Sequence, residues 1–347
     1  MRESLQTFCW ARSSAALILL GAVVLGGSIA DAVPLAPPLA VSLKIVGDYA
    51  LPGRATRWDY MSIDATRPRM AVAHLGDSTV VLIDTKTKAV IGSVAHISDV
   101  HGVLAIPELD RIYASATGSN EIVAIDAQTL KVTARIPTGE YPDGIAYAPP
   151  AHKIYVSNEN GGSLTVIDTL ANRVVKTIVL GGSVGNTQYD PATGHIFTNV
   201  QGTTELVEID PATDTIVERT VIPGADGNHG LLIEPTLRRA FIACEGNDLL
   251  IVLDLRTKKV LAQFHVGSGP DVLGYDAALQ MLYVASESGV VSVLKINATG
   301  ATLVTQKFVG PNAHTLAVDA STHEVYFPLK EKGHSPVLRV MRPLSVK

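Results

Sequence analysis

The chain has 347 residues, of which 47% are hydrophobic, 18% charged and only 5% aromatic, a composition that can fill many small cores. The net charge is -5, and no run of Lys and Arg exceeds two consecutive residues. The chain as a whole therefore lacks the excess of positive charge that nucleic-acid-binding proteins usually have, which argues against a nucleic-acid partner.

The first 32 residues have the features of a cleaved secretory signal peptide. Arg2 and Arg12 supply a positive n-region, residues 15–29 are an apolar run, and Ala30-Asp31-Ala32 is an A-x-A cleavage site. A transmembrane anchor is the alternative, but a membrane span needs about 18 or more apolar residues and this run is shorter. We therefore expect an exported mature chain, periplasmic or secreted, without a transmembrane segment.

Cleavage after residue 32 would leave a chain that begins with a linker, residues 33–40. It would also remove Cys9, so that the mature chain has one thiol, Cys244, and no internal disulfide. Cys244 ends an apolar strand, and a free Cys in that setting is most often a small buried hydrophobe. The alternative is a thiolate ligand at a site, which the neighbouring Glu245 disfavours by raising the thiol pKa.

A short phrase then returns seven times, at intervals of 42 to 44 residues. Each copy runs through four or five mostly apolar residues and usually ends in a turn. A fixed period in this range indicates an array of equivalent units, and four short strands with their turns fit into about 40 residues. The sequence therefore predicts an all-β fold over residues 41–347: a single seven-bladed β-propeller with four antiparallel strands per blade. The copies begin at Asp59, His101, Asp143, Gly185, His229, Asp271 and His314.

The second unit shows the four strands most clearly, at residues 101–106, 111–116, 121–126 and 130–136. The seventh unit lacks a fourth strand, whereas residues 41–49 form a strand without a unit of its own. We expect this N-terminal strand to complete the last blade from outside, which closes the ring and removes an open gap.

The second strands carry phrases such as IYVSN at residues 154–158, LYVAS at 282–286 and IFTN at 196–199. These phrases resemble the YVTN-type repeat of seven-bladed propellers, as in bacterial YncE-like proteins, and the resemblance covers residues 41–343. It implies the propeller fold and export. It implies no particular function, because propellers host binding modules, lyases, hydrolases and redox enzymes alike.

The repeat superimposes the first residue of each phrase at one mouth of the central channel. The second strands run antiparallel to the first and return to the same face, where they add further polar residues. Two aromatic residues flank Asp59 and could form a wall over the mouth. The sequence predicts a ligand site made of Trp58, Asp59, Tyr60, His74, His101, Asp143, Glu159, His229, Glu245, Asp271, Glu287 and His314.

Three histidines with open positions are the arrangement that a catalytic Zn uses, and neutral imidazole also suits Cu. We therefore expect His101, His229 and His314 to hold one divalent transition metal, Zn or Cu. Carboxylates nearby could orient the imidazoles or serve as a general base. The candidates for the base are Asp59, Asp143, Asp271 and Glu287. The alternative is a polar, water-filled mouth without an ion.

Three functions remain open at this point. The first is an exported monomeric binding protein with a small molecule or metal ion at the channel mouth. The second is a metal-dependent lyase or hydrolase that uses the same residues, so the sequence leaves open whether the chain is an enzyme. The third is a scaffold that binds a protein partner through its outer blade edges.

Overall fold

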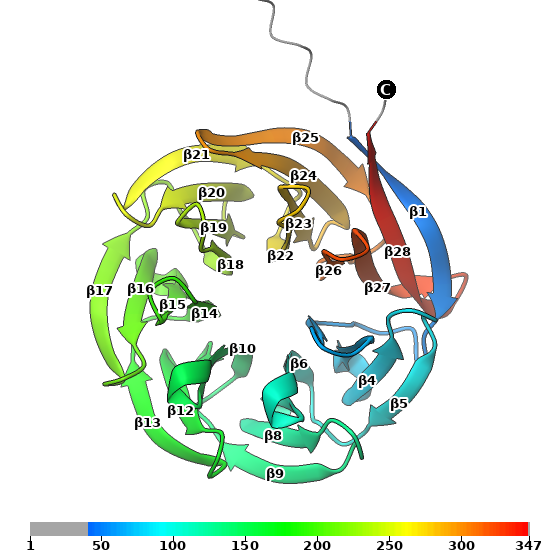
Figure 1. Cartoon of the computed structure of the whole chain (residues 1–347), viewed down its shortest axis with the longest axis horizontal. Helices are drawn as coiled ribbons and strands as arrows, with labels where there is room; N and C mark the ends of the chain where they lie inside the picture. Colours follow the sequence, from blue (N-terminus) through cyan, green and yellow to red (C-terminus); the bar gives the residue numbers. More distant parts are fainter. Residues whose placement is uncertain (1–40, 346–347) are drawn as a thin grey trace, which may run out of the picture. The chain divides into compact units, whose positions relative to one another are not determined.

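The computed structural model describes residues 41–345. The predicted signal peptide, residues 1–32, and the predicted linker, residues 33–40, lie outside the described part of the chain. Residues 41–345 form seven four-stranded antiparallel sheets, arranged in a ring around a central channel (Figure 1). The predicted seven-bladed propeller is confirmed.

Each blade is one sheet whose strands follow one another from the channel to the rim. Blade one contains β2 (Met61–Ile63), β3 (Arg69–His74), β4 (Thr79–Asp84) and β5 (Val90–Val94). Blade two contains β6 (Val100–Ile106), β7 (Arg111–Ala116), β8 (Glu121–Asp126) and β9 (Val132–Pro137). Blade three contains β10 (Pro142–Ala148), β11 (Lys153–Asn158), β12 (Ser163–Asp168) and β13 (Arg173–Val179). Blade four contains β14 (Val184–Asp190), β15 (His195–Val200), β16 (Glu205–Asp210) and β17 (Thr215–Val221).

The remaining blades follow the same order, except that the last one takes its outer strand from the start of the domain. Blade five contains β18 (Asn228–Glu234), β19 (Arg239–Cys244), β20 (Leu249–Asp254) and β21 (Lys259–His265). Blade six contains β22 (Pro270–Asp276), β23 (Met281–Ser286), β24 (Val290–Asn297) and β25 (Gly300–Phe308). Blade seven contains β26 (Ala317–Asp319), β27 (Glu324–Lys332), β28 (Ser335–Ser345) and β1 (Val41–Ala50).

Helical structure among residues 41–345 is limited to short 3₁₀ turns between strands. These are η1 (Leu75–Asp77), η2 (Pro107–Leu109), η3 (Thr117–Ser119), η4 (Pro149–Ala151) and η5 (Gln201–Thr203). No described helix is long and apolar enough to cross a membrane.

The recurring Asp at the end of the third strand in blades one to five has a local structural role. In β4, Asp84 Oδ1 accepts hydrogen bonds from the backbone N–H groups of Lys86 and Thr87, at 2.9 and 2.7 Å. Asp126 and Asp254 make the same pair of bonds in blades two and five. An Asp side chain that satisfies the turn behind it ends the strand and starts the return to the outer strand.

The hydrophobic core lies between neighbouring blades. One cluster joins Trp58 and Met70 of blade one to Tyr326 and Leu338 of blade seven. Another cluster joins blades six and seven and includes Leu43 of β1. Because each blade buries its faces against two neighbours, the ring must close for the first and last blades to be covered.

The closure uses the N-terminal strand, as the sequence predicts. Strand β1 pairs antiparallel with β28, and the two lie side by side in Figure 1 although they are the two ends of the described chain. Asp48 stands directly opposite Arg339 in this pair. The Arg339 guanidinium donates from Nε to Asp48 Oδ1 and from Nη2 to Oδ2, both at 2.8 Å, and Lys332 Nζ lies 2.5 Å from the same carboxylate.

Candidate functional site

The innermost strands of blades two to six are bulged where the repeat begins. In β10, Pro142 pairs with Asn158 and Ile145 pairs with Val156, so Asp143 and Gly144 together stand opposite a single residue. The same shift occurs in β6, β14, β18 and β22. A bulge bends the strand and re-aims the side chain at the extra residue. In blades two, three, five and six, this local geometry directs the side chain at the repeat start toward the channel mouth.

These side chains surround a cavity of about 130 Å³ at the mouth. Nine of the twelve predicted ligand residues line it, together with Arg57 and Tyr141, which sequence reasoning missed. Six of the lining side chains are carboxylates. The predicted residues in the lining are Asp59, Tyr60, His101, Asp143, Glu159, His229, Glu245, Asp271 and Glu287.

Three of the predicted ligand residues, Trp58, His74 and His314, do not line this cavity. Trp58 is buried in the core between blades seven and one, and its ring stacks on the His74 imidazole with centroids 3.7 Å apart. His74 Nε2 bonds with Thr56 Oγ1 at 2.9 Å. Both aromatic rings therefore pack blade one, because the residue before Asp59 points away from the channel.

Cys244 is also a core residue. It is fully buried in the blade-five cluster, as the sequence favours, and burial raises the pKa of its thiol to about 12. A thiol in this state is neither a nucleophile nor a metal ligand at neutral pH.

His229 lies where side chains from several blades meet. Its Nε2 is 3.6 Å from Asp271 Oδ1, 3.7 Å from Asp143 Oδ2 and 3.4 Å from the Tyr60 hydroxyl. Its Nδ1 is 2.7 Å from the amide of Gln201. With a metal bound at Nε2, the imidazole proton would be on Nδ1. The side-chain amide of Gln201, rotated by 180° so that Oε1 and Nε2 exchange places, would then accept a hydrogen bond from Nδ1.

His314 is almost fully buried, with 1% of its surface exposed. Its Nδ1 donates to the carbonyl oxygen of Asn312 at 3.0 Å, which leaves Nε2 with a lone pair. Nε2 is 4.0 Å from Asp59 Oδ1. Blade seven therefore offers the site an imidazole whose tautomer the backbone selects.

Three buried polar atoms of the site have no hydrogen-bond partner within the described structure: Asp143 Oδ2, Asp271 Oδ1 and His314 Nε2. Buried polar groups are nearly always paired, and each exception costs free energy. Asp143 Oδ2 and Asp271 Oδ1 lie 3.7 and 3.6 Å from His229 Nε2, beyond hydrogen-bond distance, and His314 Nε2 lies 4.0 Å from Asp59 Oδ1.

Two groups of possible metal ligands occur within residues 41–345. One consists of His229, Glu245 and Asp271, and the other of Asp271, Glu287 and His314; in each, the ligand atoms lie within 4.8 Å of one another. The three predicted histidines do not fall into one group. His101 is in neither, because Asp99 O lies 2.8 Å from its Nδ1 and the Tyr141 hydroxyl 3.1 Å from its Nε2.

Arg57 places a fixed positive charge beside the second group. Its Nη1 is 2.7 Å from Glu287 Oε1 and its Nε is 3.6 Å from Asp59 Oδ2. Burial lowers the pKa of Arg57, but the Asp59, Glu287 and Asp271 carboxylates outweigh this and the net shift is upward. The group of Asp271, Glu287 and His314 therefore has an Arg guanidinium bonded to one of its carboxylates, whereas no such ion pair is found at Glu245 within residues 41–345.

The titration of the cluster reflects its burial and its excess of carboxylates. Burial opposes protonation of His229, but Asp271, Glu245 and Asp143 favour it more and raise its pKa to about 9. Burial raises the pKa of Asp143 to about 6 and that of Asp271 well above its ordinary value. The cluster thus retains protons at neutral pH that a divalent cation would displace.

A signal for the missed residues was present in the repeat. Arg57 and Tyr141 each stand two positions before a repeat start, as do Asp99 and Asn312, whose carbonyl oxygens orient His101 and His314. In blades one, two, three and seven, the loop that enters the blade therefore contributes a residue to the mouth or orients one there.

The comparisons with known proteins identify the fold and no more. No protein-family model matches the chain, and no curated protein matches it. Among solved structures, it is similar to Kuenenia stuttgartiensis hydrazine synthase, with a TM-score of 0.71 and 16% identity over 83% of this chain and 96% of that one. Because 1797 chains of solved structures match, this similarity shows the propeller fold and does not indicate a function.

Proposed function

We propose that this chain is a binding propeller that holds one divalent transition metal ion, such as Zn or Cu, at the acidic mouth of its channel. The ligands are His229, Glu245 and Asp271. The observation that carries this proposal is the unpartnered, buried Asp271 Oδ1, 3.6 Å from His229 Nε2, in a cavity lined by six carboxylates. A mixed set of imidazole and carboxylate ligands suits divalent transition metals.

The test is titration of Zn²⁺ into the full chain after chelator treatment, with protein purified without a His tag. Binding of one ion per chain supports the proposal, and Asp271→Asn should weaken it about 100-fold or more, because it removes a charged ligand. Asp126→Asn is the matched control, since it makes the same exchange in a turn where Asn can replace Asp. Absence of saturable Zn²⁺ and Cu²⁺ binding to the unaltered chain would overturn the proposal.

A metal-dependent lyase or hydrolase is the second candidate, and one observation favours it. A larger cavity, of about 550 Å³, shares Arg57, His101 and Tyr141 with the lining of the mouth cavity. Its volume is within the range of small-molecule sites. Of the predicted general bases, Asp271 becomes a ligand and Glu287 is bonded to Arg57, which leaves Asp59 and Asp143. Hydrolysis of a p-nitrophenyl ester that stops on chelation and in Asp271→Asn would favour this candidate.

The proposal includes export, which rests on residues 1–32, and kinship with the YVTN-repeat propellers, which rests on the strand phrases quoted above. Export predicts that the N-terminal residue of protein recovered from the producing cells is Val33. Recovery of a chain that begins at Met1 from a cytoplasmic fraction would contradict it.

A further inference from the structure

Blade three brings three polar residues of the mouth together: Tyr141, Asp143 and Glu159. Pro142 pairs with Asn158 across β10 and β11, and Asp143 and Glu159 each lie one residue beyond this pair. The backbone N–H of Glu159 donates to the carbonyl oxygen of Tyr141 at 2.8 Å, which ties the loop before β10 to the end of β11. None of the three residues belongs to a metal-ligand group.

The two carboxylates of blade three are the ones that the rest of the mouth leaves without a cation. Of the six carboxylates that line the mouth, Arg57 pairs with two, and two more are ligands of the proposed metal. Asp143 and Glu159 remain. Asp143 is 2% exposed, and its Oδ2 has no hydrogen-bond partner because His229 Nε2 lies 3.7 Å away. The ion pairs at the mouth involve Arg57, His229 and His314, and none within residues 41–345 involves Glu159.

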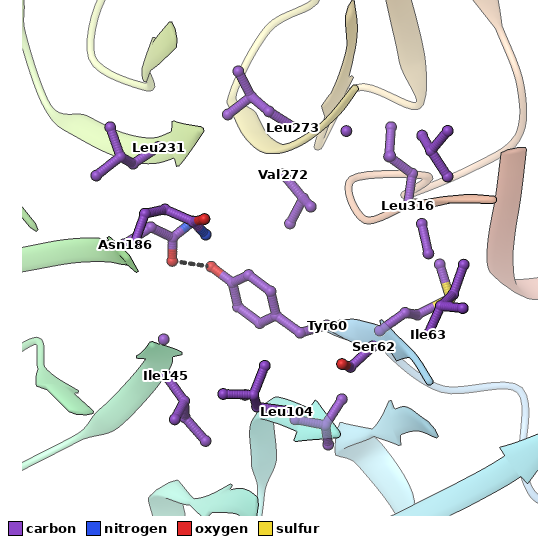
Figure 2. A pocket seen from close by; sticks show the side chains of 18 of the residues that line it. Tyr60, Ser62, Ile63, Leu104, Ile145, Asn186, Leu231, Val272, Leu273 and Leu316 are labelled. Atoms are coloured by element: carbon purple, nitrogen blue, oxygen red, sulfur yellow. Dashed lines mark hydrogen bonds between the residues drawn. The ribbon is translucent and has the colours of Figure 1, made fainter. Parts of the chain in front are cut away.

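The two phenols of the mouth do not supply the missing donor. Tyr60 donates its hydroxyl hydrogen to Asn186 Oδ1 at 2.5 Å, and Figure 2 shows the ring extended from its strand toward Asn186. His101 Nδ1 lies 2.8 Å from the carbonyl oxygen of Asp99, which can only accept. In the neutral imidazole, Nε2 is therefore the acceptor of the Tyr141 hydroxyl, 3.1 Å away. Each phenol oxygen can still accept a hydrogen bond, but neither has a second hydrogen to donate.

Tyr141 is also an exception among the loops that enter the blades. Its φ is +60°, in the left-handed region that bulky residues rarely adopt. The equivalent residues of blades two, five, six and seven share a positive φ and are small or polar: Asp99, Gly227, Gly269 and Asn312. Blade three therefore accepts backbone strain in order to place an aromatic ring at the mouth.

We propose that Tyr141, Asp143 and Glu159 bind the ammonium group of a primary amine. An ammonium group has three N–H donors and one positive charge, which matches two carboxylates without a cation and a phenol oxygen that can accept. An aromatic ring beside the cation adds a favourable cation–π interaction. The six carboxylates exceed the charge of Arg57 and one divalent ion together, so the mouth attracts a further cation.

The cavities at the mouth have space for such a molecule. The mouth cavity, of about 130 Å³, takes the ammonium group and the methylene next to it. The cavity of about 550 Å³ that shares Tyr141 takes the rest of the amine. Because the site uses none of the metal ligands, it goes beyond the proposed function and can be tested separately from it.

The experiment titrates n-butylamine, which is protonated at pH 7, into the full chain with and without Zn²⁺ and follows binding by calorimetry. The expected result is saturable binding of one molecule per chain, at least tenfold tighter than that of 1-butanol, which has the same alkyl chain and no charge. Glu159→Gln should weaken amine binding at least tenfold and leave Zn²⁺ binding unchanged, because Glu159 is not a metal ligand. Asp143→Asn, which removes the other charge without changing the shape, is a second variant in case the first does not fold.

Glu140→Gln is the matched control, since Glu140 is an exposed residue of the same loop and lines neither cavity. It should bind n-butylamine as the unaltered chain does. The proposal is overturned if n-butylamine does not bind saturably, if 1-butanol binds as tightly, or if a folded Glu159→Gln or Asp143→Asn variant binds the amine with unchanged affinity. Displacement of the amine by one equivalent of Zn²⁺ would also overturn it, because the amine would then occupy the metal ligands. Amine binding in a chain that binds no Zn²⁺ would support this site and contradict the proposed function alone.

Discussion

Arg57 Nη1 lies 2.7 Å from Glu287 Oε1, so a guanidinium from blade one is bonded to a blade-six carboxylate that belongs to the second metal-ligand group. Asn312 Nδ2 bonds to the other oxygen of the same carboxylate. Both oxygens of Glu287 are therefore engaged, and the positive charge of Arg57 stands where a second ion would otherwise be attracted.

Replacing Arg57 should therefore open the second group. We expect Arg57→Met to raise Zn²⁺ stoichiometry from one to two ions per chain, because Glu287 and His314 lose the neighbouring guanidinium and the Asp271 carboxylate, shared by both groups, can bridge two ions. Calorimetry or elemental analysis measures this. Arg54→Met is the control, since Arg54 bonds to Asp77 and is in neither ligand group. A stoichiometry of one in Arg57→Met would show that Arg57 does not limit metal uptake.

Gly185 is the one repeat start without a side chain, and the neighbouring blade explains why. A Cβ at this position would lie 2.6 Å from the carbonyl oxygen and 2.8 Å from the Cα of His229. Gly185→Ala should lower the free energy of unfolding by about 1–3 kcal/mol, because blade four would have to move away from blade five. It should also weaken Zn²⁺ binding, since the backbone of a ligand is displaced.

Gly300→Ala is the matched control for this prediction. A Cβ at Gly300 meets no atom within 4 Å, so its free energy of unfolding should change by no more than about 0.5 kcal/mol. Chemical denaturation measures both variants. An equal free energy of unfolding for Gly185→Ala and the unaltered chain would mean that blades four and five can accommodate a methyl group at this contact without loss of packing.

The closure of the ring should depend on the Asp48 carboxylate. Asp48→Asn removes the charged partner of Arg339 and Lys332 from strand β1, and we expect it to lower the free energy of unfolding by about 1–3 kcal/mol at neutral pH. Glu331→Gln, at an exposed position on β27, should have little effect.

This stabilisation should also vary with pH in a defined direction. The hydrogen bond from Arg339 lowers the pKa of Asp48 to about 2. The carboxylate therefore stabilises the fold above the unfolded-state pKa, about 3.9, and loses this effect as the pH falls through about 2. The difference between Asp48→Asn and the unaltered chain should be constant from pH 7 to about pH 4 and shrink below it. A difference that grows on acidification would contradict this assignment.

Cys244 should be unreactive in the folded protein. Because it is fully buried and its thiol pKa is raised to about 12, Ellman's reagent should not modify it until the chain is unfolded in guanidinium chloride. The unfolded chain should then show one thiol if residues 1–32 have been removed and two if Cys9 is retained. Rapid modification of Cys244 in the folded state would indicate local opening of blade five.

The sequence was sufficient to predict the architecture because its determinants are local. Alternating apolar residues specify strands, the Asp at the end of the third strand in five blades specifies a turn, and a period of 42 to 44 residues gives the number of blades. Unit seven lacks a fourth strand, and residues 41–49 form a strand without a unit. The simplest way to close the ring is therefore for this N-terminal strand to complete blade seven. The same repeat register predicted most of the side chains that line the mouth.

Which of those side chains meet was decided by the tertiary structure, because distances across a channel depend on contributions from different blades. In blades two, three, five and six a bulge sets the direction of the ring side chain, and a repeat alignment does not show it. His101 is engaged by Asp99 and Tyr141, so it does not join His229. Arg57 enters from the loop before a repeat start, and the sequence alone did not show that its side chain turns into the mouth. Tyr60 donates a hydrogen bond to Asn186, 126 positions later in the sequence, and only the closed ring brings these two side chains together (Figure 2).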